Sequence, residues 1–197
     1  MPIYNGIEFI DESVPTVINQ TYTKWELIIG INGHEKDSEV YNIAKKYENE
    51  KIKVLELDTK GKSNSLNEMI KLCKYDWVAL LDVDDKWFNN KLENQVQYMK
   101  DYDVIGTFCQ YFGDMSGKPK LPKRDLTRFN FNNYNPVINS SCLVKKELCW
   151  WDQQIDGVED YDLWKRLKNK NKKFYNVPKI LVLHRIHKES AFNSKTR

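Results

Sequence analysis

The sequence predicts an α/β domain built on a mostly parallel central sheet with helices on both faces. Short apolar strands and amphipathic helices alternate through residue 100, which is typical of parallel strands joined by helical crossovers. The apolar run at residues 78–81 contains nothing polar, as expected of a strand buried on both faces. Neither an internal repeat nor a linker divides the 197 residues, so a single domain over 1–197 is predicted.

The elements follow in order along the chain. Residues 1–6 are expected to form a loop, because proline fixes φ and Asn-Gly favours a turn. Apolar residues at helical spacing predict helices over 7–20, 38–50, 65–73, 89–100, 145–150 and 161–169. Apolar runs predict strands over 24–31, 52–57, 78–81, 104–112, 137–144, 173–177 and 180–183. Pro15 is expected to kink or restart the first helix, 113–135 to form a long mobile loop, and 184–190 a polar tail.

Composition excludes several classes of protein. The formal net charge of +3 is too balanced to indicate nucleic-acid binding. No apolar stretch reaches the roughly 20 residues that span a bilayer, and no signal peptide opens the chain, so no integral membrane segment is expected. The four cysteines lack CxxC spacing and lie in or beside apolar segments, which indicates reduced core thiols in a cytoplasmic protein.

Three acidic residues follow the apolar run at 78–81. Side chains alternate along a strand, so Asp82 and Asp84 are expected to point together beyond the carboxyl edge of the sheet, where α/β folds bind ligands. Two adjacent carboxylates repel each other unless a cation lies between them, and hard oxygen ligands suit Mg²⁺ or Mn²⁺. The alternative is a polar turn in which the acids cap the following helix.

Taken together, the motifs resemble the inverting family 2 glycosyltransferases of GT-A fold over nearly the whole chain. The segments that carry the resemblance are 2–6, 19–22, 25–29, 61–63, 65–67, 81–85, 159–167 and 184–187. Each is common by chance, but their order and spacing resemble the family pattern. The resemblance implies a metal-dependent hexosyltransferase that moves a sugar, with inversion, from a nucleotide-diphosphate donor to a hydroxyl on a glycan or protein. A UDP-sugar is the expected donor.

The resemblance also implies a metal site. Asp84 would coordinate the ion, while Asp82 would contact the donor's ribose or a water on the ion, with Val83 between them in the nucleotide-binding motif. Asp85 is expected to cap the next helix. His187 would be a late metal ligand, and an imidazole favours Mn²⁺ over Mg²⁺; the alternative is an exposed tail histidine.

For the chemical step, the resemblance implies that Asp160 is the base that takes the acceptor hydroxyl's proton. Glu159 would orient that base or the acceptor. The alternative is that both acids cap the helix they begin. Trp151, just before this motif, is a candidate for stacking on an acceptor sugar.

The nucleotide is expected over the first two strand ends. Pro2 and Tyr4 would line it, and the Tyr4 ring would stack on uracil. Relatives end the second strand in an acid that bonds the base, whereas this chain has Asn32, which can donate and accept. Lys62 would approach the diphosphate, unless it is a plain surface lysine.

One family element has no counterpart in the sequence. Relatives carry a buried apolar strand just before the Pro-x-Tyr-Asn segment, and this chain starts at Met1. Either Met1 is an internal residue of a longer frame, or a shortened fold fills the gap by dimerising, as a homo-oligomer, or by re-pairing strands. A non-catalytic relative that binds nucleotide or glycan without turnover is the alternative function. A nucleotidyltransferase would need a glycine-rich basic signature that segment 2–6 does not provide.

Overall fold

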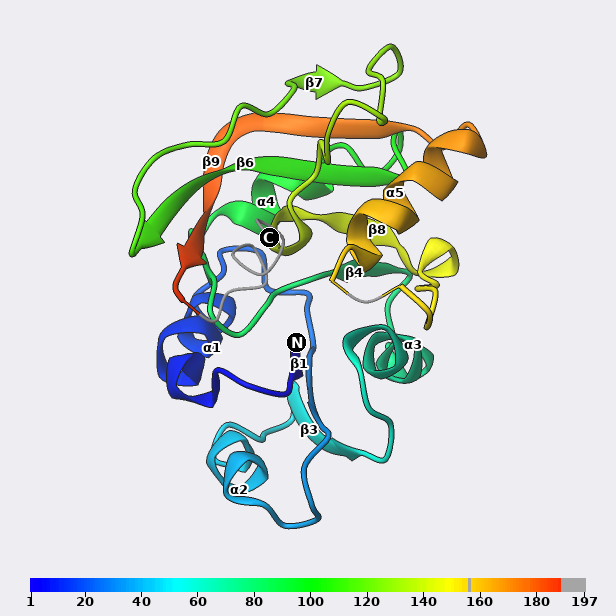
Figure 1. The fold of residues 1–197 in the computed structure, drawn as a ribbon. Helices are drawn as coiled ribbons and strands as arrows, with labels where there is room; N and C mark the ends of the chain where they lie inside the picture. Colours follow the sequence, from blue (N-terminus) through cyan, green and yellow to red (C-terminus); the bar gives the residue numbers. More distant parts are fainter. Residues whose placement is uncertain (156, 189–197) are drawn as a thin grey trace.

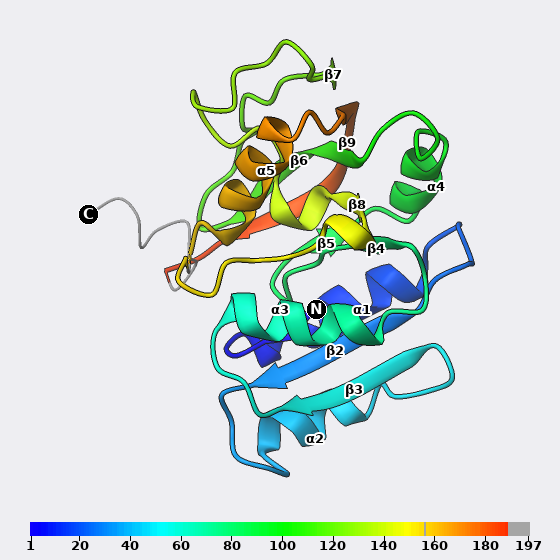
Figure 2. The same ribbon diagram turned by 90° about the vertical axis from the view of Figure 1, so that its right-hand side faces the viewer.

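Two β-sheets with helices packed around them form the computed structural model, which describes residues 1–155 and 157–188 (Figure 1). The first sheet is parallel, in the order β1-β2-β3, and its strands are β1 (Pro2–Ile3), β2 (Leu27–Asn32) and β3 (Ile52–Leu57). Helices α1 (Ile10–Ile18) and α2 (Glu39–Lys45) cover one face, and α3 (Lys62–Leu72) covers the other (Figures 1 and 2). This half follows the predicted α/β pattern.

The second sheet is mixed, which corrects the prediction of one mostly parallel sheet. Its order is β4-β8-β6-β9-β5, with β7 paired to β9. The long strands β6 and β9 are parallel, and the other pairs are antiparallel. The strands are β4 (Trp77–Ala79), β5 (Lys86–Trp87), β6 (Val104–Gly113), β7 (Arg124–Asp125), β8 (Leu143–Lys145) and β9 (Phe174–Ile186). No helical crossover joins β6 to β8 in this described part of the chain; the segment between them returns through β7 and a short 3₁₀ turn.

Of the remaining helical elements, α4 (Lys91–Val96) is shorter than the predicted helix over 89–100, whereas α5 (Glu159–Asn169) begins two residues before the predicted helix over 161–169. The others are three 3₁₀ turns, η1 (Ile7–Phe9), η2 (Asn139–Ser141) and η3 (Lys146–Leu148). The predicted strand over 137–144 is therefore mostly turn, and the helix over 145–150 is a single 3₁₀ turn. Pro15 lies inside α1 without ending it.

Three predictions for segments near the chain ends are wrong. Pro2 and Ile3 form a strand, not a loop, because β2 offers them an edge to pair with. The two short strands predicted around Pro178 are one strand, β9, in which the register shift opposite Phe108 accommodates the proline. β9 continues through Ile186, so the first part of the predicted polar tail is strand; residues 189 and 190 of that tail lie outside the described residues.

Two main clusters of buried side chains hold the fold together. One packs the first sheet against α1, α2 and Trp87, and the other surrounds Trp151 and Trp164 beneath α5. All four cysteines are free thiols. Within 1–155 and 157–188, no helix has the length and apolar character needed to cross a bilayer.

Candidate active site

A cleft of about 1,060 Å³ opens where β2 and β4 end, between the two sheets. Asn32 reaches it from β2, Asp82 and Asp84 from the turn after β4, Asp160 from the first turn of α5, and His187 from the residue after β9. Segments more than 150 residues apart in sequence therefore line one cavity. The two acidic motifs singled out in the sequence lie together.

The turn after β4 is held by its last acid. Asp85 is fully buried; one oxygen accepts the N–H of Arg185 at 2.8 Å and the other lies 2.9 Å from His184 Nδ1. Burial alone would lower the pKa of His184, but the Asp85 carboxylate outweighs it and raises that pKa to about 9. The prediction that Asp85 caps the next helix is therefore wrong. Its carboxylate instead connects the acidic turn to β9.

Asp84 and His187 lie side by side, with Oδ2 and Nε2 3.2 Å apart. Burial, together with the negative charges of Asp85 and Asp82, raises the pKa of Asp84 to about 6. A divalent cation would neutralise this concentration of carboxylates, and the oxygen and imidazole donors fit Mn²⁺ or Mg²⁺. No three acidic, histidine or cysteine side chains in the described residues form a complete cage. An ion held here would take further ligands from a bound substrate or water.

Lys62 connects the two acidic motifs. Its Nζ lies 2.8 Å from Asp82 Oδ1 and 3.3 Å from Glu159 Oε1. Burial would lower the pKa of Lys62, but these carboxylates outweigh it and raise that pKa. Burial would likewise raise the pKa of Asp82, but Lys62 and the Asn139 amide, which donates to both Asp82 oxygens at 3.2 and 3.0 Å, lower it. Asp82 is thus held as a fixed anion.

Asp160 is oriented from two sides. One oxygen accepts a hydrogen bond from Asn135 Nδ2 at 2.9 Å, and the other accepts the backbone N–H of Tyr161 at 2.7 Å. Burial and the neighbouring Glu159 raise the pKa of Asp160, and Lys62 opposes them. A carboxylate with a raised pKa is a better proton acceptor near neutral pH than one with the ordinary value.

Four of the residues predicted to hold a nucleotide line the same cleft. Pro2, Tyr4, Asn32 and Val83 all contribute to its wall. Asn32 is buried at the end of β2, whereas the Tyr4 ring is 58% exposed and lies over the α-carbon of Gly33. The exposed ring has a face available to a flat ligand.

Trp151 cannot play the role predicted for it. Its side chain is 0% exposed inside the second core cluster, and its backbone N–H donates to Asn67 Oδ1 at 2.9 Å. A side chain without accessible surface does not stack on an acceptor sugar, so that prediction is wrong. Large aromatic side chains are more often needed for packing, and this one is.

Sequence reasoning missed the asparagines that hold the acids. Asn135 and Asn139 contact Asp160 and Asp82, and both belong to a segment, 130–139, that holds five asparagines. That density of amides in an otherwise irregular loop was the available signal. The segment was instead interpreted as mobile loop and strand.

Comparisons with known proteins agree with this geometry. The family model described as "Glycosyl transferase family 2" matches residues 1–151, which is most of the chain. The chain belongs to glycosyl transferase family 2. The predicted enzyme class, a glycosyltransferase, is confirmed at the level of the family.

Three relatives show how far the similarity extends. The UDP-Glc:alpha-D-GlcNAc-diphosphoundecaprenol beta-1,3-glucosyltransferase WfgD of Escherichia coli is 26% identical over 99% of this chain and 79% of its own length. Among solved structures, S. aureus TarS 1-349 in complex with UDP-GlcNAc matches with a TM-score of 0.80 at 16% identity, over 100% of this chain and 60% of TarS 1-349. The mannosyltransferase PcManGT from Pyrobaculum calidifontis, in complex with GDP-Man and Mn²⁺, matches with a TM-score of 0.70 at 16% identity, over 96% of this chain and 56% of its own. The chain therefore spans less than two thirds of these solved structures, which show the GT-A fold.

Proposed function

We propose that this protein transfers a sugar from a nucleotide-diphosphate donor to a hydroxyl acceptor, with inversion and with a divalent cation. The observation that carries the proposal is that the turn holding Asp82 and Asp84 and the helix start holding Glu159 and Asp160 line one cleft. Lys62 bridges the two motifs. A site of this kind can place a leaving diphosphate at one end and an attacking hydroxyl at the other.

Each residue takes one role in this proposal. Asp84 and His187 hold the cation, which when bound neutralises charge on the leaving diphosphate. Asp82 fixes the donor's ribose, since Lys62 and Asn139 keep that carboxylate ionised and oriented. Lys62 also lies at the start of α3 with its charge directed into the cleft, where it would attract the diphosphate.

Asp160 removes the proton from the acceptor hydroxyl. Asn135 and the N–H of Tyr161 leave the carboxylate fixed while the hydroxyl approaches, which limits the reorganisation needed in the transition state. Glu159, held by Lys62, stands beside it and raises its pKa. The acceptor enters over the segment around Tyr134 and the loop around Pro119, which form the outer wall.

We infer a UDP-sugar as the donor, with Pro2, Tyr4, Asn32 and Val83 around the nucleotide. The similarity to WfgD, a UDP-Glc-dependent glucosyltransferase, supports this choice. The acceptor named for WfgD is alpha-D-GlcNAc-diphosphoundecaprenol. We propose a glycan acceptor here, with a protein acceptor as the alternative. A single domain, a cytoplasmic location and a homo-oligomer stay predictions.

A thermal-shift series with nucleoside diphosphates tests the proposal. UDP is expected to raise the melting temperature only when Mn²⁺ or Mg²⁺ is present, because binding to the folded state alone stabilises it. Asp84→Ala is expected to abolish the shift. Stabilisation by UDP that is independent of metal would contradict the proposed site.

The same series separates an enzyme from a binding relative. Asp160→Asn should keep the UDP and metal shift and reduce sugar transfer, and donor hydrolysis, by at least about 100-fold. If the substitution removes binding instead, the assigned role of Asp160 is wrong. If the natural protein binds UDP with metal and never hydrolyses or transfers any UDP-sugar, the non-catalytic alternative holds.

A further inference from the structure

Arg185 lies next to the acidic turn and contacts four other segments of the chain. It lies near the end of β9, where it pairs with Phe112 of β6. Paired residues of neighbouring strands point to the same face of a sheet, and the guanidinium carbon of Arg185 lies 4.4 Å from the centre of the Phe112 ring. The ring of Phe9, the last residue of η1, has its centre 4.3 Å from the same carbon. The side chain therefore packs against two aromatic rings, an environment that suits the planar, weakly hydrated guanidinium.

The polar atoms of this guanidinium reach the turn that holds the acidic motif. Its Nε donates to the backbone carbonyl of Asp84 at 2.9 Å, and its Nη2 lies 2.8 Å from Glu12 Oε2 of α1. The backbone N–H of Arg185 donates to Asp85, as described above. Only 13% of the Arg185 side chain is exposed, so its contacts restrict its movement on several sides. Arg185 therefore fixes the carbonyl of Asp84 with respect to α1 and β9.

Phe9 extends this arrangement to the second proposed metal ligand. Its ring centre lies 5.4 Å from that of His187, with an angle of 56° between the two planes. Phe9 closes the η1 turn, because its N–H donates to Gly6 O at 3.0 Å. Gly6 has a φ of 88°, and a Cβ there would lie 3.0 Å from Val83 Cγ1, so η1 packs tightly on the acidic turn. A single ring, held in place by its backbone, therefore contacts both Arg185 and His187.

We propose that Arg185 and Phe9 are positioning residues that set the relative placement of Asp84 and His187, the proposed ligands of the divalent cation. This inference rests on the function proposed above. The two ligands are 103 residues apart in sequence, yet their side chains lie 3.2 Å from each other. The bond to the Asp84 carbonyl and the ring against the His187 imidazole limit the movement of both groups before an ion binds. Groups that orient metal ligands in this way strengthen metal binding without touching the metal.

A purely structural role for the same contacts predicts a different result, and Lys86 separates the two roles. Lys86 Nζ lies 2.9 Å from the same Glu12 oxygen and 4.6 Å from the centre of the same Phe112 ring. Both cations lower the pKa of Glu12, Lys86 more than Arg185. Arg185 adds the contacts to the acidic turn and to η1. If this cluster only anchored α1, removing either cation would have the same effect on the metal site.

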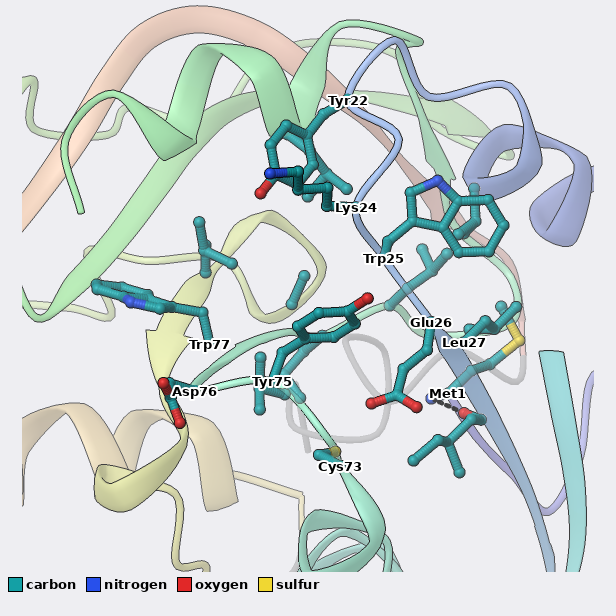
Figure 3. Close-up of a pocket in the computed structure, with 18 of the residues that line it drawn as sticks. Met1, Tyr22, Lys24, Trp25, Glu26, Leu27, Cys73, Tyr75, Asp76 and Trp77 are labelled. Carbon is teal, nitrogen blue, oxygen red and sulfur yellow. Dashed lines mark hydrogen bonds between the residues drawn. The ribbon is translucent and has the colours of Figure 1, made fainter. Parts of the chain in front are cut away.

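Mn²⁺ binding to the full chain, measured by electron paramagnetic resonance, tests the proposal; the melting temperature in EDTA is recorded for every variant. Arg185→Met removes the guanidinium, and Phe9→Leu removes the ring while keeping an apolar side chain. Lys86→Met is the matched control for the loss of a cation from the same cluster. Leu27→Ala is the control for lost stability alone, because Leu27 is a buried residue that lines a separate apolar cavity between the sheets (Figure 3).

Arg185→Met is expected to weaken Mn²⁺ binding by about 10–100-fold, the range for residues that orient metal ligands, and Phe9→Leu is expected to weaken it in the same direction. Lys86→Met and Leu27→Ala should leave the Mn²⁺ affinity unchanged, whatever they do to the melting temperature. Natural affinity in Arg185→Met, or an equal loss of affinity in Lys86→Met, would overturn the proposal. A similar loss in Leu27→Ala would also overturn it, because the effect would then be one of general destabilisation.

A metal-free measurement separates this inference from the proposed function. In EDTA, the imidazole nitrogen signals of His187 are followed by NMR, with those of His34 as an internal reference. Arg185→Met should shift the His187 signals, because the Asp84 carboxylate beside that ring is no longer fixed, whereas Lys86→Met should not. If the natural protein binds no Mn²⁺, the metal in the proposed function is wrong, and the His187 signals alone decide the positioning. Identical His187 signals in Arg185→Met and the natural protein would overturn the positioning itself.

Discussion

Removing the charge of Asp84 is expected to stabilise the metal-free protein above pH 6. The pKa of Asp84 is raised from 3.8 to about 6 by burial and by its acidic neighbours, so the folded state binds this proton more tightly than the unfolded state does. The group therefore favours folding at low pH, and that contribution is lost as the pH rises through about 6. At 1.36 kcal/mol per pH unit, the difference between 3.8 and about 6 corresponds to a cost of about 3 kcal/mol at pH 8.

Asp84→Asn has no charge to place in the cleft, so it avoids this cost. For a chain of this length 1 kcal/mol corresponds to about 2–4 °C in melting temperature. The variant should melt about 6–12 °C above the natural protein at pH 8 in EDTA. At pH 4.5 the remaining cost is about 1 kcal/mol, so the difference should shrink to about 2–4 °C. Mn²⁺ should stabilise the natural protein at pH 8 and should do little for the variant.

Two controls make the measurement specific to Asp84. Asp101→Asn changes an exposed acid and should move the melting temperature little at either pH. Asp85→Asn should destabilise, because it removes the partner of the charged His184 imidazole from a buried site. A melting temperature of Asp84→Asn equal to or below that of the natural protein at pH 8 would refute the assigned electrostatics of the cleft.

Other substitutions probe parts of the fold that position the site. Lys62→Met leaves two carboxylates without their cation and should cost about 2 kcal/mol at pH 7 in urea unfolding. The loss should become smaller only as the pH falls below 3.8, because the lowered pKa of Asp82 contributes stability above that ordinary value. Lys91→Met removes a fully buried amine whose pKa burial lowers to about 7, so it should raise the melting temperature more at pH 6 than at pH 9.5; a constant difference would contradict this. Gly30→Ala would place a Cβ 2.6 Å from Met69 Sδ and should cost about 1–3 kcal/mol, measured by urea unfolding against the natural protein; an unchanged free energy of unfolding would contradict this.

The sequence predicted the half of the fold that local patterns determine. β2 and β3 carry continuous or alternating apolar residues, and their strands lie close to where those patterns place them. Asp82 and Asp84 line the cleft as expected, although a turn after Ala79 brings them there and not strand alternation. In these segments a side chain's neighbours in sequence decide its environment.

Predictions failed where distant segments decide the structure. Trp151 was predicted to stack on an acceptor sugar because it lies just before the acidic motif at 159–160. In the structure it is buried in the second core cluster, together with residues of α5 and β6. Asp85 reads as a helix cap, but β9, a hundred residues away, supplies its partners His184 and Arg185. Pro2 was predicted to lie in a loop, but pairing with β2 makes it part of a strand. No local pattern contains these contacts, so one sequence could not give them.

The acidic cleft costs the fold stability, and this cost identifies it as a site for a ligand. Four carboxylates from two segments line the cleft: those of Asp82 and Asp84 in the turn after β4, and those of Glu159 and Asp160 at the start of α5. Lys62 and the charged His184 supply the opposing cations described above. A fold selected for stability alone would gain from replacing Asp84, since burial and two like charges penalise its ionised form. A divalent ion reverses the sign of that interaction. The same charge that destabilises the metal-free protein would then hold the ion, so stability and metal binding are properties of one group of side chains.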